Sequence, residues 1–170
     1  YIQTQNRLLS FQEYFVKFQC EPSVTNFVFK GLDKAKFNPL IKLDNFDEII
    51  ICPSNPFVSI SPIIQLEPLN EYLQSHPERV NVVSPIVNSK SLKGPTSKMM
   101  KELGMDTSVL TIAKYYSKYA QTLFIDASDH QEEKLIKNMG YKVSLADLVM
   151  NNLDSKINLA QSVIDYLELK

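Results

Sequence analysis

The sequence predicts an α/β protein with a Rossmann-like, mostly parallel sheet flanked by helices. Apolar runs rich in Val, Ile and Phe recur along the chain, and amphipathic stretches separate them. Apolar runs that do not alternate with polar residues are typical of strands covered on both faces. Strands that alternate with helices in this way favour a parallel sheet joined by right-handed crossovers.

Five short segments have the composition of strands. The first alternates apolar with polar residues, and the second is a continuous apolar run. The five segments are separated by stretches long enough for a helix, which predicts parallel strands. The expected strands are 25–29, 48–52, 80–84, 122–126 and 141–145.

The helices expected between these strands have recognisable ends. Pro68 suits a first helical turn, and Gly104 suits a left-handed cap at a helix end. Ser128 with Gln131 has the spacing of a capping box, in a helix that closes at Gly140. The last helix is expected to bury one apolar face, made of Ile157, Ala160, Ile164 and Leu167.

Composition restricts the class of protein. The chain has 170 residues, of which 44% are apolar and 22% charged, as in one soluble globular domain. A net charge of −1 gives no electrostatic reason to expect nucleic acid or a membrane surface as a partner. With only two cysteines and no disulfide framework, we expect a cytoplasmic protein. Cys20 and Cys52 lie outside any metal-binding pattern and are expected to be reduced and mostly buried.

Ligands of open parallel sheets bind beyond the carboxyl ends of the strands. The segments that follow the predicted strands are therefore the candidates for a site. They are 53–62, 84–95, 126–129 and 146–152.

The first candidate segment is polar and uncharged. Ser54, Asn55, Ser59 and Ser61 follow a buried strand, with prolines such as Pro56 between them. Backbone N–H groups at a helix start there can hold phosphate or the edge of a base. The alternative is a turn with a helix cap, which the residue types alone favour.

The second segment has the features of a phosphate-binding loop. Lys93 and Gly94 precede a helix, and Thr96 can cap it. The spacing is not that of a Walker A loop, and a loop with a solvated lysine explains the residues equally well. In the third segment, Asp126 can hold Mg²⁺ through water, whereas Asp129 is expected to join Ser128 in capping the next helix.

An aromatic stripe lies near the start of the chain. Phe11, Tyr14, Phe15 and Phe18 have helical spacing and are expected to belong to the core. Gln12 and Glu13 lie off this apolar line and can face a cleft, so together with Tyr14 they are candidates for a substrate pocket.

Taken together, these segments resemble one family. "FQEYFVKFQCEP", "PSNPFVSISPII", "SPIVNSKSLKGPTSKMMKELG" and "FIDASD" are similar, in order and spacing, to the 2-phospho-L-lactate transferases of coenzyme F-420 biosynthesis. The resemblance implies transfer of a phospholactyl or phosphoenolpyruvyl group from a guanosine diphosphate-type donor. The acceptor is the terminal ribityl hydroxyl of the deazaflavin Fo, GMP leaves, and Mg²⁺ is required.

The resemblance also implies roles for the candidate residues. The donor would meet Ser54, Asn55, Pro56, Ser59, Ser61, Lys93, Gly94 and Thr96. The acceptor would meet Gln12, Glu13 and Tyr14, and Asp126 would meet the metal. Because members of the family often form dimers, a homodimer is also expected.

The chain departs from the family pattern at three places. Ser61 stands where glycine is common, and Asn88-Ser89 replaces a usual glycine pair. The glycine-rich loop of the family's N-terminal part is missing, so residues 1–170 are expected to be the C-terminal part of a single α/β transferase domain and inactive alone. The alternatives are a nucleotide-sugar-binding regulatory protein of a related superfamily and a scaffold that has lost its chemistry.

Overall fold

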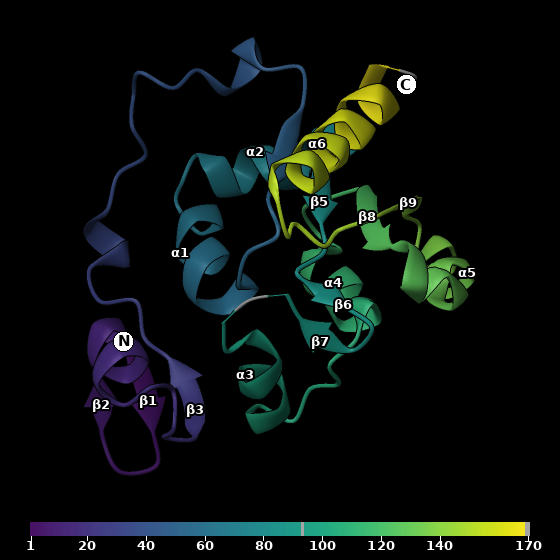
Figure 1. Cartoon of the computed structure of the whole chain (residues 1–170). Helices are drawn as coiled ribbons and strands as arrows, with labels where there is room; N and C mark the ends of the chain where they lie inside the picture. Colours follow the sequence, from purple (N-terminus) through teal and green to yellow (C-terminus); the bar gives the residue numbers. More distant parts are fainter. Residues whose placement is uncertain (93, 169–170) are drawn as a thin grey trace.

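The computed structural model describes residues 1–92 and 94–168. Its centre is a parallel sheet of four strands in the order β4-β5-β8-β9 (Figure 1). The fold class predicted from the sequence is therefore confirmed. The strands are β4 Ile49–Ile51, β5 Val80–Val83, β8 Thr122–Asp126 and β9 Lys142–Ala146.

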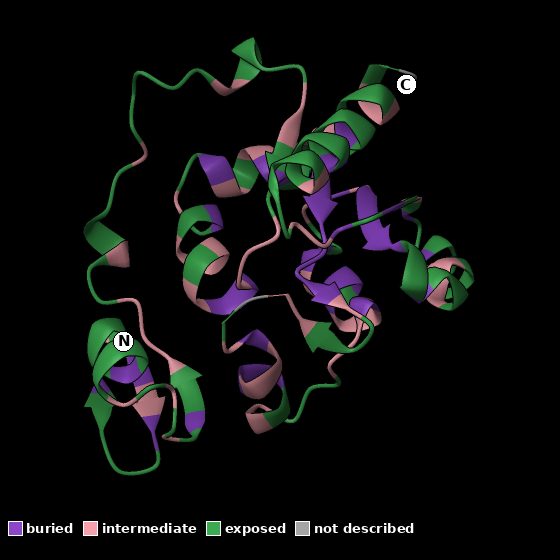
Figure 2. Ribbon diagram, in the orientation of Figure 1, coloured by how far each residue is buried: buried purple, intermediate pink, exposed green. Residues whose placement is uncertain are grey.

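Helices pack on both faces of this sheet. Val82 and Leu123 belong to a large apolar cluster on one face, whereas Val83 and Phe124, the next residues along each strand, belong to a smaller cluster on the other. This alternation follows from the two-residue period of a strand. Figure 2 shows β5 and β8 as buried along their whole length. The large cluster includes residues of α1 Ser61–Ile64, α2 Leu69–Ser75, α3 Thr96–Glu102, α4 Val109–Tyr116 and α5 Glu133–Asn138.

The smaller cluster lies under the last helix, α6 Leu153–Glu168. The prediction of which face of α6 is buried is wrong. Ile157 and Ile164 are 53% and 46% exposed, and Ala160 is exposed as well. Leu159 and Val163 face the sheet instead, and Leu167 packs beside them. Both sets have helical spacing, so the packing against Val83 and Phe124 decides which set is buried.

The predicted strand near residue 25 is not part of the parallel sheet. It forms β3 Val24–Phe27, which pairs antiparallel with β1 Ile2–Thr4, and β1 pairs antiparallel with β2 Leu8–Leu9. This small sheet lies beside α3, away from the four parallel strands (Figure 1). Val24 is buried in this strand, whereas Thr25 and Asn26 are both exposed, and the pairing with β1 is irregular between Gln3 and Thr4.

A hairpin of β6 Ile86–Val87 and β7 Lys90–Ser91 turns through Asn88 and Ser89. Their φ angles are +47° and +60°, as a two-residue turn of type I′ requires. Glycine adopts this conformation without strain. Asn tolerates it better than most residues, whereas Ser89 adopts it against its preference.

The helix ends partly follow the prediction. Gly104 has φ +72° and, with Met105, completes a Schellman motif through bonds to the carbonyls of Lys101 and Met100. The capping box predicted at Ser128 is wrong, because Asp126 caps this segment and the Ser128 hydroxyl donates to its carboxylate. The remaining short helical segments are η1 Glu13–Lys17, η2 Leu32–Lys34, η3 Leu43–Asn45, η4 Pro56–Ile60, η5 Pro77–Arg79 and η6 Ala127–Glu132.

Two further expectations concern the surface. Both cysteines are free, but Cys20 is only half-buried and Cys52, which follows the edge strand β4, is exposed. The expectation of mostly buried thiols is therefore wrong. No helix within the described ranges combines the length and the apolar character needed to cross a membrane.

Candidate functional site

A cavity of about 430 Å³ lies beyond the carboxyl ends of the parallel strands. Three of the four segments expected there from the sequence contribute to its wall, and two rings from the N-terminal aromatic stripe complete it. The segment 126–129 does not line it. The lining residues are Phe11, Phe15, Pro53, Ser54, Asn55, Val58, Ser59, Pro85, Leu92, Gly94, Pro95, Leu148, Val149, Met150 and Asn151.

Asn55 shapes the first segment. Its side-chain oxygen accepts hydrogen bonds from the N–H groups of Phe57 and Val58, at 2.9 and 3.2 Å, and so caps η4. Its backbone carbonyl accepts from the N–H groups of Ser59 and Ile60. The interpretation as a capped turn is confirmed, and these four N–H groups already have protein partners. They are not the outward-facing phosphate donors that the sequence suggested.

Ser54 and Ser59 are better placed to meet a ligand. Both line the cavity, and within residues 1–92 and 94–168 neither hydroxyl forms a hydrogen bond. Pro56 is buried beneath them, and its carbonyl accepts a hydrogen bond from Tyr115. Ser61 lies outside the cavity lining, where its hydroxyl contacts Gln65. Its φ of −50° is helical, so this position accepts a side chain without strain.

The second segment contributes Gly94 and its neighbours. Gly94 is exposed with φ +67°, and a Cβ there would meet nothing within 4 Å, so glycine is needed for its backbone angle and not for space. Thr96 is the buried first residue of α3 and does not cap it; the expected cap is wrong, since Pro95 precedes the helix without a side-chain bond. Lys93 lies outside the described residues.

Asp126 does not line the cavity but holds part of its wall in place. One carboxylate oxygen accepts from the N–H and hydroxyl of Ser128, and the other accepts from the N–H of Leu148 at 3.0 Å. Leu148 lines the cavity, so Asp126 fixes its position. Asp129 does not help to cap the next helix, contrary to expectation. Both of its oxygens accept from the N–H of Asn88 in the hairpin turn.

The two carboxylates differ in acidity for physical reasons. Burial acts to raise the pKa of Asp126, but the hydrogen bonds from Ser128 and Leu148 outweigh it and hold that pKa below its usual value. Burial raises the pKa of Asp129, and the negative charge of Asp126 adds to this effect against the bond from Asn88. Among the described residues there is no group of three or more His, Cys, Asp or Glu side chains that could hold a metal ion.

The aromatic stripe divides between core and cavity. Tyr14 is fully buried, and its hydroxyl donates to the carbonyl of Cys20. Phe11 and Phe15 are exposed and line the cavity, so the expectation that they belong to the core is wrong. Gln12, Glu13 and Tyr14 are not among the lining residues.

Glu13 has a structural partner instead. Its carboxylate accepts from the N–H and hydroxyl of Ser10, whose hydroxyl accepts from the N–H of Glu13. These reciprocal bonds form a capping box, and they hold the pKa of the Glu13 carboxyl below its usual value. The sequence "SFQE" has the spacing of this motif and would have predicted it.

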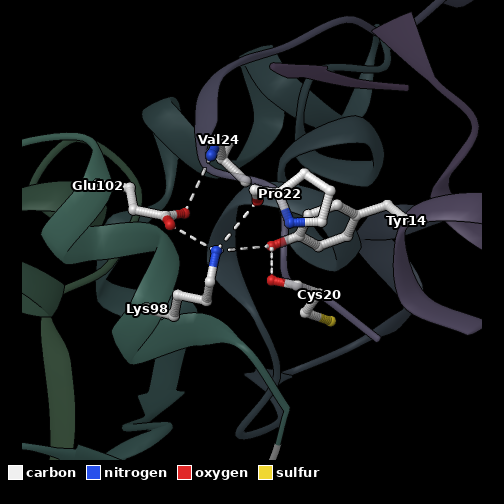
Figure 3. Close-up of polar contacts among 6 residues, drawn as sticks. All are labelled: Tyr14, Cys20, Pro22, Val24, Lys98 and Glu102. Carbon is white, nitrogen blue, oxygen red and sulfur yellow. Dashed lines mark hydrogen bonds and ion pairs between the residues drawn. The ribbon is translucent and has the colours of Figure 1, made fainter. Parts of the chain in front are cut away.

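Sequence reasoning did not identify Lys98 and Glu102, which join α3 to the N-terminal part of the chain (Figure 3). The Lys98 ammonium donates to the carbonyl of Pro22 at 3.1 Å and pairs with Glu102. Glu102 also accepts from the N–H of Val24 at 3.0 Å. On the same helix, the sulfur of Met99 accepts from the Asn55 side chain at 3.3 Å, which connects the two candidate motifs.

Fold and cavity define an open-sheet α/β protein with a cavity at the carboxyl ends of its strands, the place where such folds bind ligands. Residues 2–149 match the family model described as "2-phospho-L-lactate transferase CofD". The chain belongs to this family.

Similar curated proteins carry the same description. The 2-phospho-L-lactate transferase of Methanosarcina barkeri is 31% identical over 166 residues, which cover 96% of this chain and 53% of that protein. The one from Methanocaldococcus jannaschii is 34% identical over 94% of this chain and 50% of its own length. The chain therefore spans about half the length of the curated relatives that it matches.

Proposed function

We propose that the chain is part of a 2-phospho-L-lactate transferase that acts on the deazaflavin Fo. The terminal ribityl hydroxyl of Fo would attack the phosphorus of a guanosine diphosphate-type donor, and GMP would leave. What supports the proposal is that five residues of "PSNPFVS" and the "GP" of the second motif line one cavity at the sheet edge where such folds bind ligands; the five are Pro53, Ser54, Asn55, Val58 and Ser59. The cytoplasmic location and the homodimer stay predictions.

The proposed reaction needs positioning more than a protein nucleophile, because the attacking oxygen belongs to the substrate. We assign ligand contact to the hydroxyls of Ser54 and Ser59, which are free within the described residues. Glycine at 94 supplies the left-handed backbone angle that this loop of the cavity wall requires. Asn55 and Asp126 act as positioning residues, since they hold the first turn of η4 and the backbone of Leu148.

Mg²⁺ belongs to the proposal through the family resemblance. The oxygens of Asp126 already accept three hydrogen bonds. The described residues offer no cluster of three ligands, so they do not by themselves form the metal site. Chelation with EDTA tests the requirement, and GMP release that continues unchanged would contradict it.

The transfer is tested with the polypeptide encoded by the complete reading frame. Incubation with Fo, Mg²⁺ and the guanylyl donor is expected to release GMP. Ser54→Ala with Ser59→Ala is expected to lower kcat/KM about tenfold, as the loss of two hydrogen bonds to the ligand implies. Ser162→Ala is the control, since this hydroxyl bonds within α6. The absence of GMP release from the unmodified protein would refute the transferase.

One observation favours a second function. No charged side chain occurs among the described residues of the cavity wall, so these residues supply no cation to stabilise the charge that develops during phosphoryl transfer. A nucleotide-sugar-binding regulatory protein would bind its ligand and release no GMP. Equilibrium dialysis with UDP-sugars, alongside the GMP assay, separates the two functions.

A further inference from the structure

We propose that Phe11 and Phe15 form an aromatic platform on which a planar heteroaromatic ring of a ligand stacks inside the cavity. The inference deepens the proposed function and rests on it, because both substrates of that reaction carry such a ring. It assigns ring binding to residues that the sequence placed in the core.

The geometry of the two rings supports a platform. Phe11 and Phe15 are 38% and 44% exposed, and both line the cavity. Their ring centroids lie 5.6 Å apart with an interplanar angle of 17°, so the rings stack on each other. Tyr14 turns into the core, so the exposed pair occupies a separate side of this helical segment. Covering exposed aromatic surface inside a cavity with another ring is energetically favourable, and so promotes binding.

The segment that carries the rings is held at both ends. The capping box of Ser10 and Glu13 fixes its start. The segment then widens into a π-helical turn, in which the N–H of Phe18 bonds to the carbonyl of Glu13 at 2.9 Å. Such turns occur frequently at functional sites. A rigid platform loses little conformational entropy when a ligand binds.

The remaining wall suits a neutral ring better than a diphosphate. Ser54 and Ser59, and apolar residues such as Val58 and Met150, line the same cavity as the two rings. None of the described lining residues is charged, and the first N–H groups of η4 are occupied by Asn55. A diphosphate requires cations or free N–H donors, whereas a ring requires stacking and a few neutral hydrogen bonds.

Two ligands of the proposed reaction supply this chemistry: the guanine base of the donor and the deazaflavin of the acceptor. Binding of GMP and of Fo is measured separately by titration of the full chain. We expect Phe11→Ala with Phe15→Ala to weaken one of the two about tenfold, the usual effect of losing a stacking side chain. Replacement of both by Tyr is expected to restore affinity, because the ring remains.

Val16→Ala is the matched control, since Val16 is 64% exposed in the same segment but outside the cavity lining. Circular dichroism checks that each variant folds. If the double variant does not fold, the affinities of the two single Ala variants test the platform instead. Unchanged affinity for both ligands, or no binding of either by the native chain, would overturn the platform.

The two proposals fail in different ways. If the platform variants lose ring binding and no protein releases GMP, the transferase is wrong and the platform stands. If GMP is released and the KM values of donor and acceptor are unchanged in the Ala variants, the platform is wrong and the transferase stands.

Discussion

Asn55 shows how one side chain can shape a site without being free to bind. Its amide oxygen caps η4, and its amide nitrogen donates to Met99 in α3. The sequence alone predicts that Asn55→Ala weakens donor binding with little loss of stability. The observed contacts predict a structural cost as well.

We expect Asn55→Ala to lower the free energy of unfolding by about 1–2 kcal/mol, the usual effect of losing a helix cap. Urea denaturation measures it. Ser54→Ala is the control, because its hydroxyl has no partner within the described residues, and it should change stability by less than about 0.5 kcal/mol. Equal stability of Asn55→Ala and the native chain would show that the cap contributes nothing.

The departures from the family pattern also have explanations at single residues. Ser61 sits in a helical conformation, so a serine at this position costs nothing in backbone strain. Ser89 is different, because its φ of +60° favours glycine. The same kind of replacement therefore has different consequences at the two positions.

At the scale of elements, the parallel strands were predictable because both of their faces are covered. Their apolar runs do not depend on which neighbour covers them, so β5 and β8 follow from composition alone. The buried face of α6 was not predictable, because two sets of residues share the helical spacing. The membership of β3 in a separate sheet depends on strand pairing, which periodicity does not specify.

The candidate site was predictable to the extent that it follows from topology. Ser54, Ser59 and Gly94 were found because they come after strands of a parallel sheet. Phe11 and Phe15 come from outside that sheet, and spacing alone cannot distinguish an exposed aromatic pair from a core one. The role of Asp126 depends on its contact with Leu148, 22 residues later in the chain, which local sequence does not reveal.

Lys98 and Glu102 form the main polar connection that Figure 3 shows between α3 and the N-terminal part. A double-mutant cycle of Lys98→Met and Glu102→Gln is expected to give a coupling of about 1 kcal/mol, since Glu102 is partly buried and also holds Val24.

The control cycle uses Lys137 and Glu133, a pair with the same spacing in α5 whose side chains are 53% and 30% exposed. Exposed pairs of this kind contribute about 0.3–0.5 kcal/mol. Urea unfolding of the variants measures both couplings. Equal values would mean that the Lys98 pair is only a surface ion pair.

At the scale of the whole molecule, one face of the sheet is incompletely covered. A groove of about 270 Å³ runs between the edge strand β4 and α6, with Ile50 and Ile164 in its wall. Ile50, Ile157 and Ile164 are all exposed. An apolar patch of this kind favours self-association.

We therefore expect the native chain to associate as its concentration rises, and Ile157→Glu with Ile164→Glu to remain monomeric. Sedimentation velocity measures this difference. Leu135→Glu is the control, because Leu135 is 51% exposed on α5, away from the groove. Association that survives in the Ile variant would place the contact elsewhere on the surface.

The small N-terminal sheet packs on the rest of the chain through Ile2, Leu9 and Val24, which belong to the large apolar cluster, and through the stacking of Phe27 on Phe57. Such a unit can open before the parallel sheet does, and its amide protons would then exchange with solvent first. A ligand seated between the Phe11 ring and Ser54 would join the unit to the first strand-end loop. Slower amide exchange in β1 and β3 would then report that the cavity is occupied.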